Sequence, residues 1–228
     1  MNTRYTKAGV LLITMFCLWQ TRQLFAGPLL GVDATSGSNG LVSGNGGLTL
    51  GWQFQVSNPN GISVNGLGFW DYQSDGFFLD QTFDVGLWNS STGNLLAESV
   101  ITSSSTLVPS LDTAGGWRVN SISSLTLTTG GLYTIGALMP VTGANQIVSD
   151  PGTYQAAPGI NFEDFDRQIG SSTLAMPNIG PPYSGAIWLG PTFTFGAVPE
   201  PSSISLLLAG LALPGMFRRF QRKNKIGT

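Results

Sequence analysis

The sequence contains no histidine and only one cysteine in 228 residues. The lack of histidine removes the commonest general base, the commonest metal ligand and every catalytic triad that uses an imidazole. A single cysteine can form neither an internal disulfide nor a cysteine-cluster zinc site. Serine catalysis without histidine would need a lysine base, and residues 27–197 contain no lysine. These absences predict that the chain is not an enzyme.

Charged residues are also scarce, at 10% of the chain against about 25% in ordinary globular proteins. Eight of the ten lysines and arginines lie in the first 26 or the last 11 residues. Residues 27–197 keep two cations, Arg118 and Arg167, against eleven acids, which leaves a net charge of −9. Such a domain offers no electrostatic footprint for nucleic acid, and divalent cations are its more natural partners.

Residues 1–26 have the pattern of a secretory signal peptide. Arg4 and Lys7 give a positive start, residues 8–19 carry no charge, and Ala26 supplies a small residue at the cleavage site. The uncharged run is shorter than the ~20 residues that a transmembrane helix needs. An uncleaved membrane anchor is the alternative. Cleavage after Ala26 would remove the only cysteine, which suits an oxidising compartment.

The C-terminus combines three features in a fixed order. Residues 198–201 read Val-Pro-Glu-Pro, residues 202–217 are uncharged and apolar in character, and residues 218–228 form a basic tail. This order predicts a short membrane helix, below the ~30 Å thickness of the hydrocarbon core, with a basic stop on its cytoplasmic side. The cations of the stop are Arg218, Arg219, Arg222, Lys223 and Lys225.

This ending resembles the PEP-CTERM sorting signal of Gram-negative bacteria, over residues 198–228. The resemblance implies that an exosortase, a membrane transpeptidase-like enzyme, recognises Pro199, Glu200 and Pro201 and cuts the chain near them. It also implies export, transient anchoring in the inner membrane, and a final place on the cell surface or in an extracellular matrix with exopolysaccharide. The expected role there is structural or adhesive. A permanently tail-anchored protein is the alternative.

Between the two ends, apolar residues follow the period of a β-strand. In residues 48–56 nearly every second side chain is apolar, and an Asn-Pro-Asn-Gly turn at 58–61 precedes the next such run. No segment shows a convincing helical period. Residues 48–197 are therefore predicted to form an all-β domain, an antiparallel jelly-roll-like β-sandwich. Residues 27–47 are expected to be a flexible leader, and residues 141–182 a long excursion over one end.

Residues 48–140 resemble an uncharacterised β-sandwich module of secreted bacterial proteins. The resemblance is carried by short runs in which glycine or leucine stands beside tryptophan or another apolar residue. These runs are Gly51–Phe54, Gly66–Asp71, Val85–Trp88, Leu95–Ala97, Gly116–Arg118 and Leu132–Gly136. The resemblance supports the fold and implies no reaction.

An acidic turn begins at Asp71. Its sequence, Asp-Tyr-Gln-Ser-Asp-Gly, places side-chain oxygens at the first, third and fifth positions and glycine at the sixth, as at the start of an EF-hand loop. The twelfth position is Thr82 instead of a bidentate glutamate, so the match is incomplete. A structural calcium ion held by Asp71, Asp75 and Asp80 is one hypothesis. A solvated acidic turn without metal is the other, and no further cofactor is expected.

Aromatic residues raise a second binding hypothesis, because exposed rings can stack on the faces of sugars. The tryptophans fall mostly in strand patterns and are expected in the core. Tyr154 and Tyr183 lie in predicted loops and are the candidates for contact with a glycan. The alternative function is therefore a calcium-stabilised carbohydrate-binding module. A hydrolase with paired carboxylates is a third class, although no spacing among the acids of residues 71–84 and 163–166 fixes such a pair.

Overall fold

The computed structural model describes residues 29–36, 40–43, 47–140, 144–147, 153–178 and 190–197. Within these residues the regular structure is β-strand, apart from one short 3-10 turn, η2, at Phe78–Asp80. The strands are β1 (Leu29–Leu30), β2 (Val32–Ser36), β3 (Gly40–Ser43), β4 (Leu48–Val56), β5 (Ile62–Tyr72), β6 (Phe83–Asn89), β7 (Leu95–Ile101), β8 (Thr106–Pro109), β9 (Gly115–Leu127), β10 (Leu132–Leu138), β11 (Ala144–Ile147), β12 (Thr153–Ala156), β13 (Ile160–Gly170) and β14 (Pro191–Ala197). In this part of the chain, no helix is long and apolar enough to cross a membrane. The predicted signal peptide and membrane helix lie outside it.

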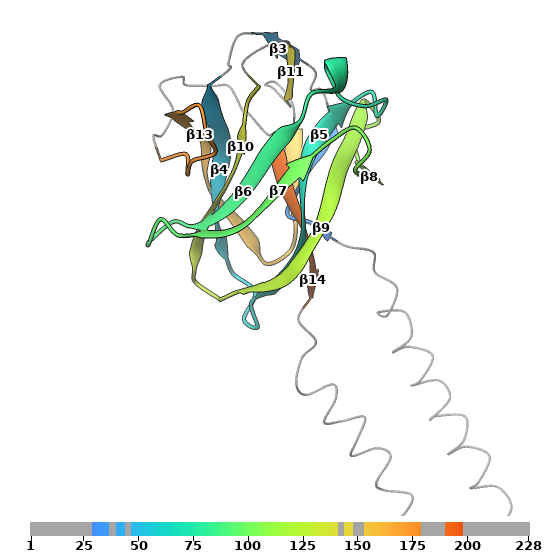
Figure 1. Ribbon diagram of the computed structural model, residues 1–228. Helices are drawn as coiled ribbons and strands as arrows, with labels where there is room; N and C mark the ends of the chain where they lie inside the picture. Colours follow the sequence, from blue (N-terminus) through green and yellow to red (C-terminus); the bar gives the residue numbers. More distant parts are fainter. Residues whose placement is uncertain are drawn as a thin grey trace, which may run out of the picture.

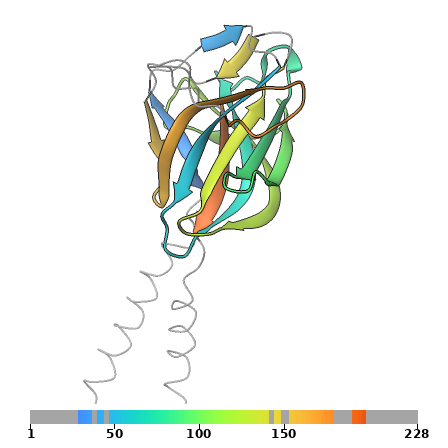
Figure 2. The same ribbon diagram turned by 90° about the vertical axis from the view of Figure 1, so that its left-hand side faces the viewer.

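The strands form two five-stranded sheets that pack face to face (Figures 1 and 2). One sheet, which we call the β5 sheet, has the order β1-β14-β5-β9-β8, and the other, the β4 sheet, has the order β13-β4-β10-β6-β7. Two short pairs, β11-β3 and β12-β2, are added to them. Neighbouring strands in the described residues run antiparallel. The prediction of an all-β antiparallel domain is confirmed.

The alternating pattern builds a core of aromatic rings between the two sheets. β4 has the bounds that the sequence predicts, and its residues Trp52 and Phe54 are fully buried. Both rings meet Phe193 of β14 across the sandwich, at centroid distances of 5.9 and 4.8 Å. Phe69 of β5 stacks on Phe83 of β6 at 3.8 Å. These contacts join one sheet to the other, and large buried rings contribute most of the apolar area.

The tryptophans of the described strands are all buried, as expected. Trp52, Trp70 and Trp117 belong to the buried hydrophobic core of the domain, and Trp70 meets Trp117 edge to face at 5.1 Å. Trp88 is 4% exposed but lies on the outer face of the β4 sheet, outside that core. Their burial assigns these rings to packing and leaves none of them as an open sugar platform.

The expectation of a flexible leader at residues 27–47 is wrong for part of that segment. β1 pairs with β14, and β2 pairs with β12. Val32 and Ala34 are fully buried in the core, and Trp117 Nε1 donates a hydrogen bond to Asp33 Oδ1 at 2.8 Å. The two strands are short and lie in a stretch rich in glycine and serine, so they show too little alternation to be recognised. The folded domain therefore includes strands that precede residue 48.

The expected excursion over residues 141–182 is also wrong in part, because β13 pairs along β4 as an edge strand of the β4 sheet. Two register shifts interrupt its alternation, which explains why its sequence looks irregular. After β13, residues 171–178 cross the outer face of the β4 sheet, and we call this segment the strap. Ala175 N–H donates to Thr49 Oγ1 at 3.3 Å, and the side chain of Pro177 is buried.

The two ends of the described domain lie at one pole of the sandwich (Figure 1). Leu29 of β1 pairs with Phe195 of β14, two residues before that strand ends. Ala197, the last residue of β14, pairs with Ile62 at the start of β5. The segments that precede and follow the domain are therefore attached at the same pole.

Candidate functional site

The acidic turn after β5 is organised around a buried ion pair. The carboxylate of Asp71 is fully buried, and Arg118 of the neighbouring strand β9 donates from Nε to Asp71 Oδ2 at 2.7 Å. The N–H of Gly76 donates to the same carboxylate at 3.1 and 3.3 Å. Arg118 also donates to the carbonyl oxygens of Ser74 and Ser105. The charge of Asp71 is therefore compensated by residues of the turn and of β9.

The structure does not bring the three predicted calcium ligands together. Asp75 and Asp80 are exposed, whereas Asp71 faces Arg118 in the interior. Within the described residues, no three His, Cys, Asp or Glu side chains form a group that could hold a metal ion. The geometry thus gives no support to a calcium site at Asp71, Asp75 and Asp80. The ion pair takes the place that the sequence suggested for the metal, because a buried carboxylate needs a partner for its charge.

Of the two tyrosines predicted to contact a glycan, the structure describes one. Tyr154 lies on β12, and its half-buried ring packs against Phe162 at a centroid distance of 5.1 Å. Burial raises the pKa of the Tyr154 hydroxyl above its usual value, because the phenolate would lose hydration. The ring therefore contributes to packing. Tyr183 lies outside the described residues.

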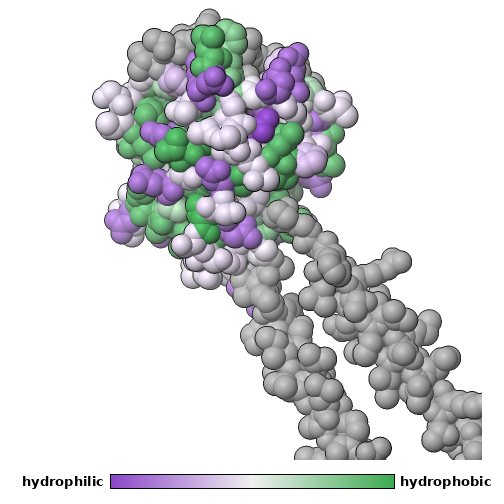
Figure 3. All heavy atoms as spheres, turned by 45° about the vertical axis from the view of Figure 1, so that its right-hand side comes forward, coloured by the Kyte–Doolittle hydropathy of each residue, from purple (hydrophilic) through white to green (hydrophobic). Residues whose placement is uncertain are grey.

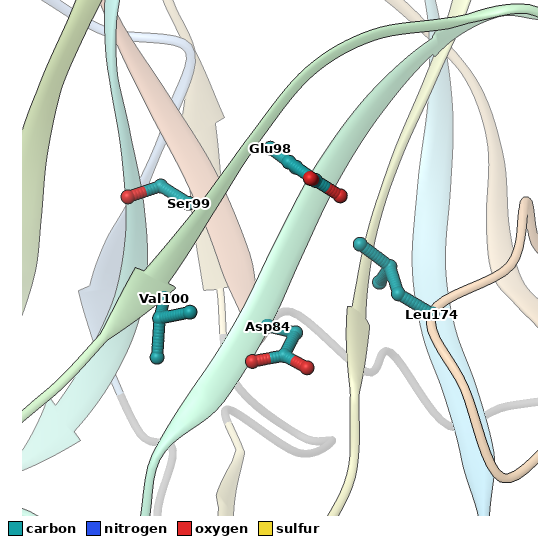
Figure 4. Close-up of a pocket in the computed structure, with 5 residues that line it drawn as sticks. All are labelled: Asp84, Glu98, Ser99, Val100 and Leu174. Atoms are coloured by element: carbon teal, nitrogen blue, oxygen red, sulfur yellow. The ribbon is translucent and has the colours of Figure 1, made fainter.

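A pocket of about 390 Å³ opens on the outer face of the β4 sheet (Figure 4). Its lining consists of Asp84 from β6, Glu98, Ser99 and Val100 from β7, and Leu174 from the strap. The register places Asp84 opposite Val100 and Glu98 opposite Gly86, so the two carboxylates occupy diagonal positions on one face. Side chains at such positions come within reach of each other. The pocket thus combines two hydrogen-bond acceptors with an apolar wall.

A row of three glycines in register runs across the β4 sheet beside this pocket. Gly51 of β4 pairs with Gly136 of β10, which pairs in turn with Gly86 of β6. A Cβ atom added at Gly86 would lie 2.4 Å from the ring of Trp88, and one added at Gly136 would lie 2.9 Å from Pro177. The Trp88 ring and the strap therefore leave no room for a side chain at Gly86 and Gly136, and at Gly51 an added Cβ would meet the backbone of β10. Side chains of the chain itself thus cover much of the row.

Sequence reasoning missed this pocket, although it noted the acids around Asp84. It singled out neither Glu98 nor Leu174, since both are isolated in the sequence. One signal was available, because the turn between β6 and β7 is short. A short turn predicts a β-hairpin, and the pairing of its two strands would bring Asp84 near Glu98. The approach of Leu174 could not be found in this way, because it depends on the path of the strap.

The end of β14 is the remaining point of interest. The strand ends at Ala197, and in the sequence only Val198 separates it from Pro199, Glu200 and Pro201. A comparison with protein-family models then decides what this end is. Residues 197–223 match the PEP-CTERM protein-sorting motif. The resemblance seen in the sequence is confirmed.

The PEP-CTERM motif covers the Pro-Glu-Pro residues, the predicted membrane helix and four of the five cations of the basic stop, with Lys225 beyond it. It implies export through an exosortase-type sorting route and a membrane-anchored passage in a Gram-negative bacterium. Its match begins at Ala197, so the PEP-CTERM motif and the folded sheet share a residue. No curated protein shows a significant match to the chain. The likeness of residues 48–140 to a secreted module stays a prediction.

Proposed function

We propose that this chain is an exported, non-enzymatic protein whose jelly-roll-like sandwich has a structural or adhesive role on the cell surface or in an exopolysaccharide-associated matrix. The observation that carries this proposal is the PEP-CTERM match, which begins where a folded, acidic β-sandwich ends. The lack of histidine in the sequence, and of lysine in residues 27–197, supports a role without catalysis.

The two ends act before this role begins. Residues 1–26 direct export, and the membrane helix predicted at residues 202–217, with its basic stop, holds the chain in the inner membrane. An exosortase-type enzyme then recognises Pro199, Glu200 and Pro201. A nucleophile of the enzyme attacks the carbonyl carbon of a nearby peptide bond, and the amino group released by that bond leaves with the tail. Water or an acceptor amine takes the acyl group from the enzyme.

The surface of the domain is compatible with a hydrated matrix. Figure 3 shows apolar and polar residues interspersed over one face of the molecule. Among the described residues, the most exposed apolar side chains are Leu79 and Leu111, at 76% and 62%. Leu79 stands between Phe78 and Asp80, and Leu111 stands between Ser110 and Asp112. A net charge of −9 over residues 27–197 favours solubility and repels other acidic chains. Divalent cations could bridge such a surface to acidic polymers.

Intact-mass analysis of the protein from native cells tests the proposal. The cell envelope and the culture medium should be measured separately. We expect a chain that has lost both ends, near Gly27 and near Pro199, in the outer envelope or the medium. A chain that keeps residues 204–228 and stays in the inner membrane would support permanent anchoring and contradict the sorting proposal.

A second candidate function, glycan binding, is favoured by the pocket of Asp84 and Glu98. Its volume of about 390 Å³ lies in the range of small-ligand sites. The two carboxylates can accept hydrogen bonds from sugar hydroxyls, while Val100 and Leu174 can contact the C–H face of a ring. This proposal places the glycan site on β6 and β7 instead of at the predicted Tyr154 and Tyr183. It requires no metal.

Binding of the domain to a glycan panel and to native exopolysaccharide tests this candidate. Glu98→Gln and Asp84→Asn should each weaken binding about tenfold, since a hydrogen bond to a charged acceptor contributes about 1.5 kcal/mol. Asp75→Asn, which removes an exposed acid elsewhere, is the matched control and should bind like wild type. Flat binding curves for the wild-type domain would exclude the candidate.

A further inference from the structure

β14 consists of a firmly held part and a weakly held end. Residues 191–195 are buried, and Phe193 and Phe195 belong to the core. Phe195 is paired on both sides, with Val64 of β5 and with Leu29 of β1. Removing this part of the strand from the sheet would expose two large rings, so it would cost much of the stability of the domain.

The last two residues of β14 are held on one side only within the described residues. Gly196 pairs with Ser63 and Ala197 pairs with Ile62, both on β5. Within the described residues, the pairing with β1 joins Leu29 to Phe195 and Leu30 to Thr194. Glycine and alanine are poor strand formers, and a Cβ atom added at Gly196 would find no atom within 4 Å. The strand is therefore weakest at the end that leads into the sorting motif.

The sorting motif begins before the strand has ended. Its match starts at Ala197, and only Val198 stands between that residue and Pro199. An extended chain advances about 3.3–3.6 Å per residue, so Pro199 can lie only about 7 Å from the last paired residue. A processing enzyme that binds its peptide in a cleft must surround several residues of backbone. The β5 strand occupies one edge of that backbone as long as Gly196 and Ala197 stay paired.

We propose that Gly196 and Ala197 form a release segment, which leaves the sheet before the sorting motif can enter the processing enzyme. The inference rests on the proposed exosortase-type processing. Release lengthens the free chain between the anchor and Pro199 from one residue to three, because Phe195 becomes the last fixed residue. The two buried rings stay in place, so the opening is a local event and the domain remains folded. Gly196 is a positioning residue that sets how easily the segment opens.

The test compares the rate of processing in three versions of the full chain, by pulse–chase and intact mass in native cells. Gly196→Val adds a β-branched side chain in open space and favours the extended, paired state. It should slow processing about three- to fivefold, since strand propensities span about 1 kcal/mol. Gly170→Val is the matched control, because Gly170 also ends a strand and its added Cβ would come no closer than 4.0 Å to Leu48. It should be processed at the wild-type rate.

A rescue separates positioning from a general effect on folding. Insertion of Gly-Ser-Gly-Ser after Ala197 in the Gly196→Val chain supplies the missing reach without opening the sheet. This insertion should restore the wild-type rate, while the melting temperature of the domain stays that of Gly196→Val. A variant that is slow only because it folds badly would not be rescued.

The outcomes are distinguishable. If the wild-type chain is never cut, the proposed function fails and this inference fails with it. If wild type is cut and Gly196→Val is cut at the same rate, this inference alone is overturned. Equal slowing of Gly196→Val and Gly170→Val, or failure of the inserted spacer to rescue, would also overturn it. Slow processing of Gly196→Val alone, with rescue, establishes the release segment.

Discussion

Acidic side chains gather at two places in this domain, and the two places differ in how the charge is compensated. On the β5 sheet, Asp71 is fully buried and receives hydrogen bonds from Arg118 and from a backbone N–H. On the β4 sheet, Asp84 and Glu98 line an open pocket, and no described lysine or arginine side chain forms a salt bridge with either. The spacing of acids in the sequence favoured the first place as a ligand site. The fold closes that place with a cation from another strand and leaves the second open.

The largest effect should follow from breaking the ion pair. Arg118→Ala leaves the Asp71 carboxylate buried without its cation, so the free energy of unfolding should fall by about 3–5 kcal/mol. Urea denaturation measures this change. Glu98→Gln, in the open pocket of the β4 sheet, is the control. It should change the free energy of unfolding by no more than about 0.5 kcal/mol because Glu98 is exposed. Equal losses of unfolding free energy in the two variants would contradict the view that Asp71 depends on a buried ion pair and Glu98 does not.

A smaller effect is expected at the glycine row beside the pocket. Gly86→Ala places a methyl group 2.4 Å from the Trp88 ring, which must move. Such overpacking should lower the free energy of unfolding by about 1–3 kcal/mol. Gly170→Ala adds the same methyl group where the nearest atom is 4.0 Å away, so its effect should be within about 0.5 kcal/mol. If both variants match wild type, the ring adapts freely and the row has no packing role.

The contrast also explains what could be read from the sequence. β4 and β5 were predictable because long alternating runs and an Asn-Gly turn define them locally. β1 and β2 were not, because strands this short carry no clear period and depend on partners at β14 and β12, more than 100 residues away. The acidic turn was visible, but its partner was not. Arg118 is 47 residues from Asp71, and only the register of β5 with β9 brings them together.

The sorting signal, in contrast, can be recognised from the order of consecutive residues alone. Proline, glutamate, an uncharged stretch and a basic tail follow one another in the chain, so no long-range contact is needed to recognise them. What the sequence could not show is that β14 ends inside this signal. That fact depends on the pairing of Ala197 with Ile62, 135 residues earlier. Local signals can thus be read directly, and contacts between distant strands cannot.

Tyr154 shows the effect of burial alone, because it is an ionisable side chain whose pKa is shifted by desolvation and not by a charged partner. Its pKa is raised by desolvation, so the unfolded chain loses the phenolic proton at lower pH than the folded chain. This contribution to stability is complete below the usual pKa of about 10 and is lost as the pH rises through the higher folded value. Between pH 9 and 11, wild type should therefore lose more stability than Tyr154→Phe, as urea denaturation at each pH would measure. Parallel pH profiles would contradict the assignment of burial as the cause.

Calcium should have the smallest effect, and it tests the comparison most directly. Because Arg118 already neutralises Asp71, neither EDTA nor millimolar calcium should move the melting temperature by more than about 1 °C. A calcium site exposed to calcium at a hundred times its Kd would instead stabilise the domain by about 2.7 kcal/mol, which corresponds to a rise of several degrees in the melting temperature.

If calcium does raise the melting temperature, the variants decide where it binds. A shift that disappears in Asp75→Asn would return the metal to the turn after β5, despite the ion pair. A shift that disappears in Glu98→Gln would place the calcium ion in the open pocket, where no described lysine or arginine side chain forms a salt bridge with Asp84 or Glu98.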